Sequence, residues 1–176
     1  GLSPSQVRDF QVFEGNAQGL RILTQLEYHR FEGGMRLTYA TLGAFLKYPW
    51  HSGFQDPEKG EKFGVYEAEL EYLHQIAAEL GLIALSDGRY CRHPLVYLME
   101  AADDICYAII DLEDGVEMNL LQYSEVESLL LDLIGEDVPS SYFDTSSEDP
   151  ARRRLAILRG KAIEIMVNSV SQVFID

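Results

Sequence analysis

The stretch MEAADDICYAIIDLED, residues 99–114, decides the fold class, because its apolar residues recur at helical intervals. Side chains three or four residues apart share one face of an α-helix. The apolar positions that keep this spacing are Leu98, Ala101, Ala102, Ile105, Ala108, Ile109 and Leu112. The same stretch carries six acidic residues and no lysine or arginine. It therefore predicts a long helix whose acidic face has no cation close by in the sequence.

Further helices are expected on both sides of this one, and no segment alternates in the way that predicts strands. Helical spacing indicates helices over about 16–29, 38–48, 66–80, 124–135 and from 150 to the end, with Pro94 in the first turn of the acidic helix. Gly81 is suited to a left-handed helix cap, and Ser124 with Glu127 suggests a capping box. The segments 50–64 and 136–149 are predicted loops. The predicted class is all-α.

Length and composition favour one helical region over residues 1–176 in a cytoplasmic protein. Apolar residues make up 47% of the 176, and no apolar stretch is long enough to cross a bilayer. The two cysteines lack a metal-ligand spacing. The net charge of −15 disfavours broad nucleic-acid binding. The one strong basic cluster is Arg152, Arg153, Arg154, Arg159 and Lys161, for which a solvated helix face is the simpler interpretation.

The acidic helix allows two interpretations. Asp103, Tyr107 and Asp111 lie four residues apart and share one face. Pattern alone favours the solvent side of an amphipathic helix. Alternatively, a carboxylate there binds a divalent metal, which requires further ligands from elsewhere. The four histidines, His29, His51, His74 and His93, do not supply a helical chelate, and His93 is expected at the start of the acidic helix.

Three motifs in order resemble the deoxyguanosine triphosphate triphosphohydrolases of the HD-domain superfamily. They are RDFQVFEGNAQGLRIL (Arg8–Leu23), LTYATLGAFLKY (Leu37–Tyr48) and LMEAADDICYAIIDLEDGVE (Leu98–Glu117). The resemblance implies an HD-domain-like helical bundle, incomplete here. In that family a histidine, a His-Asp pair and a later aspartate hold a divalent metal, for which Mg and Mn are the candidates. The later aspartate corresponds to Asp103, with Asp104 as the competing assignment.

The resemblance also implies the substrate-binding residues. Tyr107 and Asp111 correspond to residues that recognise the deoxyribose 3′-hydroxyl, and Asn16 to a residue of the same pocket. Contacts to the triphosphate correspond to Lys47, Tyr48 and Lys62, and Arg159 to an arginine that reaches the active site from a late helix. Without the family, the residues themselves favour simpler roles: core aromatics for the tyrosines, surface lysines, and a helix N-cap for Asn16.

The activity implied is hydrolysis of dGTP, or of another deoxynucleoside triphosphate, to the nucleoside and inorganic triphosphate. The resemblance further implies a homo-oligomer and single-stranded DNA as an effector, with no membrane association. An HD-type nucleotide phosphatase or phosphodiesterase, and a non-enzymatic helical interaction module, are the alternatives.

The chain departs from the family in one respect, because it contains no His-Asp dipeptide. We therefore expect a downstream part of a longer enzyme, with one metal ligand and no catalytic residue of its own. Alone, this part is expected to be inactive.

Overall fold

The computed structural model describes residues 1–28, 34–54, 60–135 and 150–176. Within these ranges the chain is helical, with no strand and only isolated bridges between His51 and Val65 and between Ala84 and Tyr90. The predicted all-α class is confirmed. The elements are α1 (Pro4–Gln11), α2 (Gly15–Arg21), a π-helical turn (Ile22–Leu26), α3 (Tyr39–Phe45), a 3-10 turn (Glu67–Glu69), α4 (Leu70–Leu80), α5 (Leu95–Glu117), α6 (Tyr123–Ile134) and α7 (Pro150–Ile175).

The chain forms two compact units, Gly1–Met99 and Glu100–Asp176, with the boundary inside α5. Each unit has its own core and is described by itself. A single helical region over residues 1–176 stays a prediction. No helix among the described residues combines the length and the apolar character that a bilayer crossing needs.

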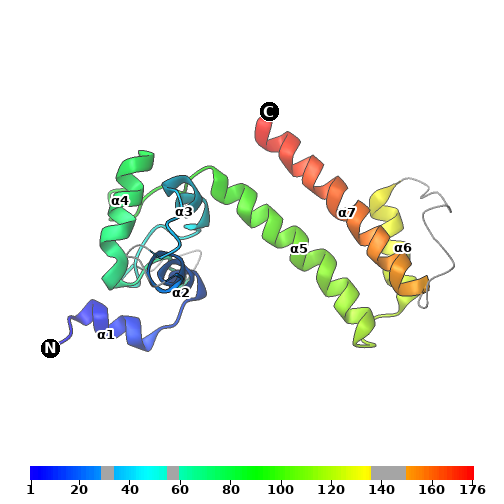
Figure 1. The fold of residues 1–176 in the computed structure, drawn as a ribbon, viewed down its shortest axis with the longest axis horizontal. Coiled ribbons are helices and arrows are strands. Elements are labelled where there is room, and N and C mark those ends of the chain that lie inside the picture. The colour runs from blue at the N-terminus through cyan, green and yellow to red at the C-terminus, as the bar shows by residue number, and fades with distance from the viewer. Residues whose placement is uncertain (29–33, 55–59, 136–149) are drawn as a thin grey trace. The chain divides into compact units, whose positions relative to one another are not determined.

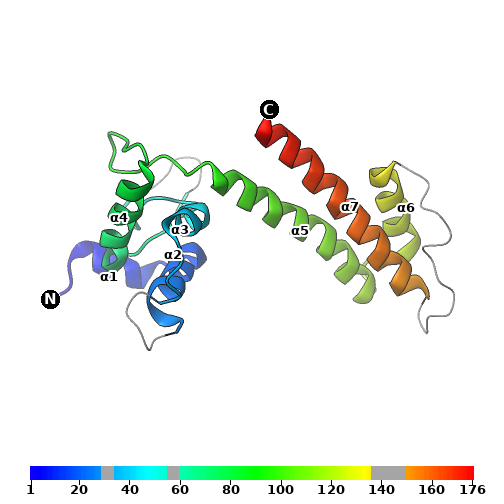
Figure 2. The same ribbon diagram turned by 45° about the horizontal axis from the view of Figure 1, so that its top comes forward.

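In the first unit, α2, α3 and α4 lie together in both views (Figures 1 and 2). The buried side chains that join them are Leu20, Leu42, Leu46, Val65, Leu73 and Ile76. Burying a leucine or isoleucine of this kind contributes about 1.5–3 kcal/mol. A second cluster, adjoining the start of α2, consists of Ala17, Tyr48, Trp50, Phe63 and Tyr66. The described parts of the segment between α3 and α4 are therefore packed into this cluster.

The helix expected over 16–29 ends earlier than predicted. Its α-helical part stops at Arg21, and the π-helical turn closes with the Glu27 amide donating to the Ile22 carbonyl at 2.9 Å. The chain then returns, so that the Met35 amide donates to the Leu23 carbonyl at 2.9 Å. Gly34 makes this return possible, since its φ is +57° and an added Cβ would lie 2.4 Å from the Leu23 oxygen. Residue 29, the expected end, lies outside the described residues.

Helix ends explain the other differences. Helix α1 was not predicted, although Ser3 and Gln6 form a capping box at its start. The capping box expected from Ser124 and Glu127 is wrong, because the chain is still extended at Gln122 and the box forms between Gln122 and Glu125. Gly81 adopts the predicted left-handed cap with φ +64°.

His93 lies just before α5, as expected, where its Nδ1 accepts the Leu95 amide at 3.2 Å. The loop expected over 136–149 lies outside the described residues.

In the second unit, α6 and α7 pack side by side (Figures 1 and 2). Their buried contact, which also includes Ile109 of α5, consists of Ile109, Val126, Leu130, Ile134, Leu155, Leu158 and Ala162. Ile105 and Ile109 are buried on α5, whereas Asp103, Asp104 and Asp111 are exposed. Of the predicted apolar face, Ile105 and Ile109 are therefore confirmed as buried, whereas Leu98, Ala101 and Leu112 are half-buried and Ala102 and Ala108 are exposed.

Candidate functional site

A buried carboxylate, that of Glu14, organises the start of α2. The Glu14 residue is only 4% exposed, and its Oε2 accepts the backbone amides of Asn16 at 2.6 Å and Ala17 at 3.4 Å. These two amides belong to the first turn of α2, where helix geometry leaves N–H groups without partners inside the helix. Glu14 is therefore the N-cap of α2, and the interpretation of Asn16 as that cap is wrong by two residues.

Two predicted substrate-binding residues meet on the other oxygen of Glu14. Oε1 accepts the side-chain amide of Asn16 at 3.0 Å and the ammonium group of Lys62 at 3.0 Å. The Lys62 side chain is 54% exposed, whereas its backbone is held by the Trp50 indole, whose Nε1 donates to the Lys62 carbonyl at 2.7 Å. The side chains of Asn16 and Lys62 therefore lie together at Glu14. Glu14 was not predicted as a site residue.

Tyr48 belongs to the second buried cluster of the first unit, which adjoins the start of α2, and Lys47 precedes it in the chain. Tyr48 is 8% exposed, and its ring lies 5.5 Å from the Trp50 ring. A Cβ added at Gly64 would lie 2.2 Å from the backbone carbonyl oxygen of Tyr48. Because glycine has no side chain, the segment that contains Lys62 can pass beside Tyr48. The core role that the residues alone suggested for Tyr48 agrees with its burial. Lys47 is half-buried beside it.

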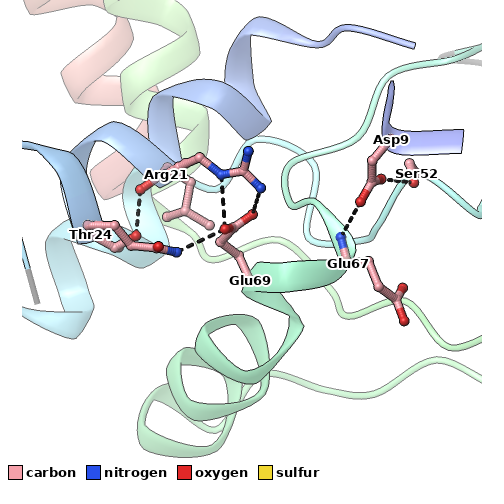
Figure 3. Close-up of polar contacts among 8 residues, drawn as sticks. Asp9, Arg21, Thr24, Ser52, Glu67 and Glu69 are labelled. Carbon is pink, nitrogen blue, oxygen red and sulfur yellow. Dashed lines mark hydrogen bonds and ion pairs between the residues drawn. The ribbon is translucent and has the colours of Figure 1, made fainter. Parts of the chain in front are cut away.

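A second buried glutamate in the same unit has a different environment (Figure 3). Glu69 is 1% exposed and accepts two hydrogen bonds from Arg21, from Nε at 3.0 Å and Nη2 at 2.9 Å, and one from Gln25 at 2.9 Å. The hydrogen bond from Arg21 to Glu69 raises the pKa of the Arg21 guanidinium, which also lies over the Tyr66 ring. None of these partners is a predicted site residue.

Figure 3 also shows Asp9 between two segments of this unit. The Asp9 carboxylate accepts the Ser52 hydroxyl and, at 2.8 Å, the Glu67 amide. Asp9 thereby joins α1 to the segment that precedes α4, because Ser52 is buried and Glu67 begins the 3-10 turn. These contacts are structural.

The remaining predicted residues belong to the second unit. Asp103, Tyr107 and Asp111 all lie on α5 and are exposed, Tyr107 by 62%. Arg159, on α7, pairs with Glu113 of α5, whose side chain is only 13% exposed. Arg159 therefore faces the acidic helix. Its partner there, Glu113, was not among the predicted site residues.

Cations from α7 offset part of the negative charge of α5 and α6. Besides the Arg159 pair, Arg152 lies 2.7 Å from Glu117, and Arg154 pairs with Glu127 of α6. The basic cluster is thus engaged with helix carboxylates, in agreement with its simpler interpretation. Asp103 and Asp111 remain exposed and can accept a ligand.

The described residues do not fit a complete metal centre. They contain no group of three or more histidine, cysteine, aspartate or glutamate side chains placed to hold an ion. Asp103 and the competing Asp104 are both exposed, and each offers one carboxylate. A divalent ion needs several such ligands. Asp103 by itself can serve as one ligand and no more.

Comparison with known proteins supplies the context for these residues. A deoxyguanosinetriphosphate triphosphohydrolase-like protein of Pseudomonas aeruginosa is 59% identical over 99% of this chain and 40% of its own length. The corresponding protein of Synechocystis is 41% identical over the same shares. A deoxyguanosinetriphosphate triphosphohydrolase of Cronobacter sakazakii is 39% identical over 78% of this chain and 26% of its own length. No family model matches the chain.

The chain thus spans about 40% of the length of these two relatives, which it matches over 99% of its own length. Identities of 59% and 41% over 99% of the chain establish homology along its length, well beyond the three motifs. The resemblance seen in the sequence is confirmed.

Proposed function

Because this chain is homologous, over nearly all its length, to deoxyguanosinetriphosphate triphosphohydrolase-like proteins, we propose that the whole protein is a deoxynucleoside triphosphate triphosphohydrolase. The proposed reaction is dGTP plus water to deoxyguanosine plus inorganic triphosphate. Water attacks the α-phosphorus, and the bond from that phosphorus to the 5′-oxygen breaks. The observation that carries the proposal is the 59% identity over 99% of the chain.

Phosphate binding is assigned to Lys47, Tyr48, Lys62 and Arg159. Lys62 is the best supported of these, because its side chain is partly exposed and Glu14 contacts its ammonium group. An ammonium group is a compact cation that binds phosphate oxygens as a point charge, whereas the Arg159 guanidinium is suited to two oxygens at once. Charge at short range offsets the net charge of −15, which opposes the approach of a polyanion at long range.

Sugar recognition is assigned to Tyr107 and Asp111, one helical turn apart and both exposed on α5. A carboxylate accepts a hydrogen bond from a hydroxyl group, and a tyrosine can donate or accept one. The Tyr107 ring also occupies space that a ribose 2′-hydroxyl would need. Asn16, in the first unit, is assigned to sugar recognition by the family resemblance alone. These assignments predict a preference for deoxynucleotides.

Asp103 is proposed as one ligand of a divalent metal ion, Mg or Mn. The other ligands are proposed to come from protein outside this chain, since the described residues offer no complete set. When bound, such an ion supplies Lewis-acid stabilisation of phosphate oxygens. The isolated chain is accordingly proposed to be inactive. A homo-oligomer and regulation by single-stranded DNA are further parts of the proposal.

Product analysis tests this function. The full-length protein is incubated with dGTP and a divalent metal, and the products are separated by ion-exchange chromatography. Deoxyguanosine and intact triphosphate in equal amounts support the proposal. Release of orthophosphate or pyrophosphate would instead indicate a phosphatase or another phosphohydrolase, and no turnover with any deoxynucleotide would favour an interaction module.

A further inference from the structure

We propose that Glu14 is a positioning residue, which holds the Lys62 ammonium group and the Asn16 carboxamide in place for a deoxynucleoside triphosphate. This inference rests on the proposed function, because Lys62 and Asn16 are assigned there to the substrate. Glu14 is 4% exposed, so its carboxylate has little surface of its own to offer a ligand. It acts through the residues it contacts.

Both oxygens of Glu14 are used, and they serve different purposes. Oε2 accepts the two backbone amides at the start of α2, which a shorter aspartate, serine or asparagine could also do. Oε1 accepts the Asn16 side chain and the Lys62 ammonium group, both at 3.0 Å. A helix cap alone therefore does not require glutamate at this position. The greater length of the glutamate side chain serves Oε1, which reaches Asn16 and Lys62, the two residues proposed to bind the substrate.

Lys62 is held at both ends and exposed between them. Its carbonyl accepts the Trp50 indole at 2.7 Å, and its ammonium group contacts Glu14, while the side chain is 54% exposed. A lysine side chain is flexible and loses rotamer freedom when it binds a ligand. An ammonium group has three N–H donors, and the Glu14 contact occupies one. Fixing the side chain in advance reduces the entropy lost when the others bind phosphate oxygens.

Glu69 is the matched comparison for Glu14. It is also a buried glutamate of the first unit, and it also holds a basic side chain of that unit (Figure 3). Its partners are Arg21 and Gln25, neither of which is assigned to substrate. Glu69→Gln therefore removes a buried carboxylate of the same unit and leaves the contact of Glu14 with Lys62 in place.

The experiment is a double-mutant cycle in the full-length protein with Glu14→Gln, Lys62→Met and both together. Two quantities are measured: KM and kcat for dGTP, and the Kd of inorganic triphosphate by calorimetry. Glu14→Gln is expected to raise KM and Kd about tenfold, equivalent to about 1.4 kcal/mol, with a smaller change in kcat. In the Lys62→Met background the same change should add almost nothing to the Kd of triphosphate, and to KM for dGTP only the part that acts through Asn16. Glu69→Gln should lower the unfolding temperature and leave KM and Kd as in the wild type.

Glu14→Asp distinguishes the helix cap from the contacts to Asn16 and Lys62. It also provides a second variant if Glu14→Gln fails to fold. Aspartate keeps the cap of α2 but its carboxylate is one methylene shorter, so it should preserve stability and raise KM. Wild-type KM and Kd in Glu14→Asp would overturn the proposal, as would an equal effect of Glu14→Gln with and without Lys62. If the wild-type protein releases no triphosphate from dGTP, the proposed function is wrong. The Kd values of triphosphate measured in the double-mutant cycle would still decide whether Glu14 positions Lys62.

Discussion

The ammonium group of Lys62 lies 3.0 Å from Oε1 of Glu14, although the two residues are 48 positions apart in the sequence. This pair joins the first motif, Arg8–Leu23, to the segment that precedes α4. Its surroundings also suggest where substitutions separate stability from substrate binding. The following predictions concern the full-length protein.

The pair of Arg21 with Glu69 is expected to be a major support of the first unit. Glu69→Gln removes the charge that Arg21 contacts through two hydrogen bonds, and should destabilise the protein by about 2 kcal/mol, less than a fully buried pair because Arg21 is partly exposed. Urea unfolding measures this. Glu71→Gln, at an exposed position two residues later in α4, is the control and should change stability by less than about 0.5 kcal/mol.

The contact of α6 with α7 should depend on single leucines. Leu130 is 1% exposed, and Leu130→Ala should cost about 2–5 kcal/mol through lost burial and the cavity left behind. The neighbouring Leu129 is 50% exposed, so Leu129→Ala should cost less than about 1 kcal/mol. Equal losses of unfolding free energy in the two variants would contradict the described packing.

Gly34 should tolerate no side chain. Gly34→Ala adds a Cβ 2.4 Å from the Leu23 carbonyl oxygen at a backbone φ of +57°, and should destabilise by more than the ~1 kcal/mol of left-handed strain alone. Gly60 has a φ of +66° with open space around it, so Gly60→Ala isolates the strain. The difference between their unfolding free energies measures the steric clash.

The turn at Asp87 should respond to pH in one direction. Hydrogen bonds from Arg89 hold the pKa of the Asp87 carboxyl below its usual value. A lowered pKa in the folded state means that this contact stabilises above the usual aspartate pKa of about 3.9 and is lost as pH falls through the lower, folded value. Titration of the carboxyl by NMR should show the pKa rising in Arg89→Gln. An unchanged pKa would show that Arg89 is not its cause.

The metal assignment distinguishes two adjacent carboxylates. If Asp103 is a ligand, Asp103→Asn should lower kcat/KM for dGTP by a factor of about 100 and weaken metal binding measured by calorimetry, because the ion loses an anionic ligand. Asp104→Asn, one position away on the same helix, should retain most of both. The reverse pattern would transfer the assignment to Asp104.

Local periodicity predicted most of the fold. The long acidic helix, its buried isoleucines and its exposed Asp103, Tyr107 and Asp111 all follow from the interval of three or four residues, and α5 confirms them. Helix α1 was missed, since it is short and buries no residue. The π-helical turn was missed as well, because it depends on the return of the chain at Gly34.

By itself the sequence determined most of the helices, the buried Ile105 and Ile109 of the acidic helix, and the homology from which the function is proposed. Only the tertiary structure decided which cation meets which carboxylate: Lys62 with Glu14, Arg21 with Glu69 and Arg159 with Glu113. The physical reason is range. Helical geometry relates residues up to about four apart, whereas these ion pairs join residues separated by 46 to 48 positions and depend on how the helices pack.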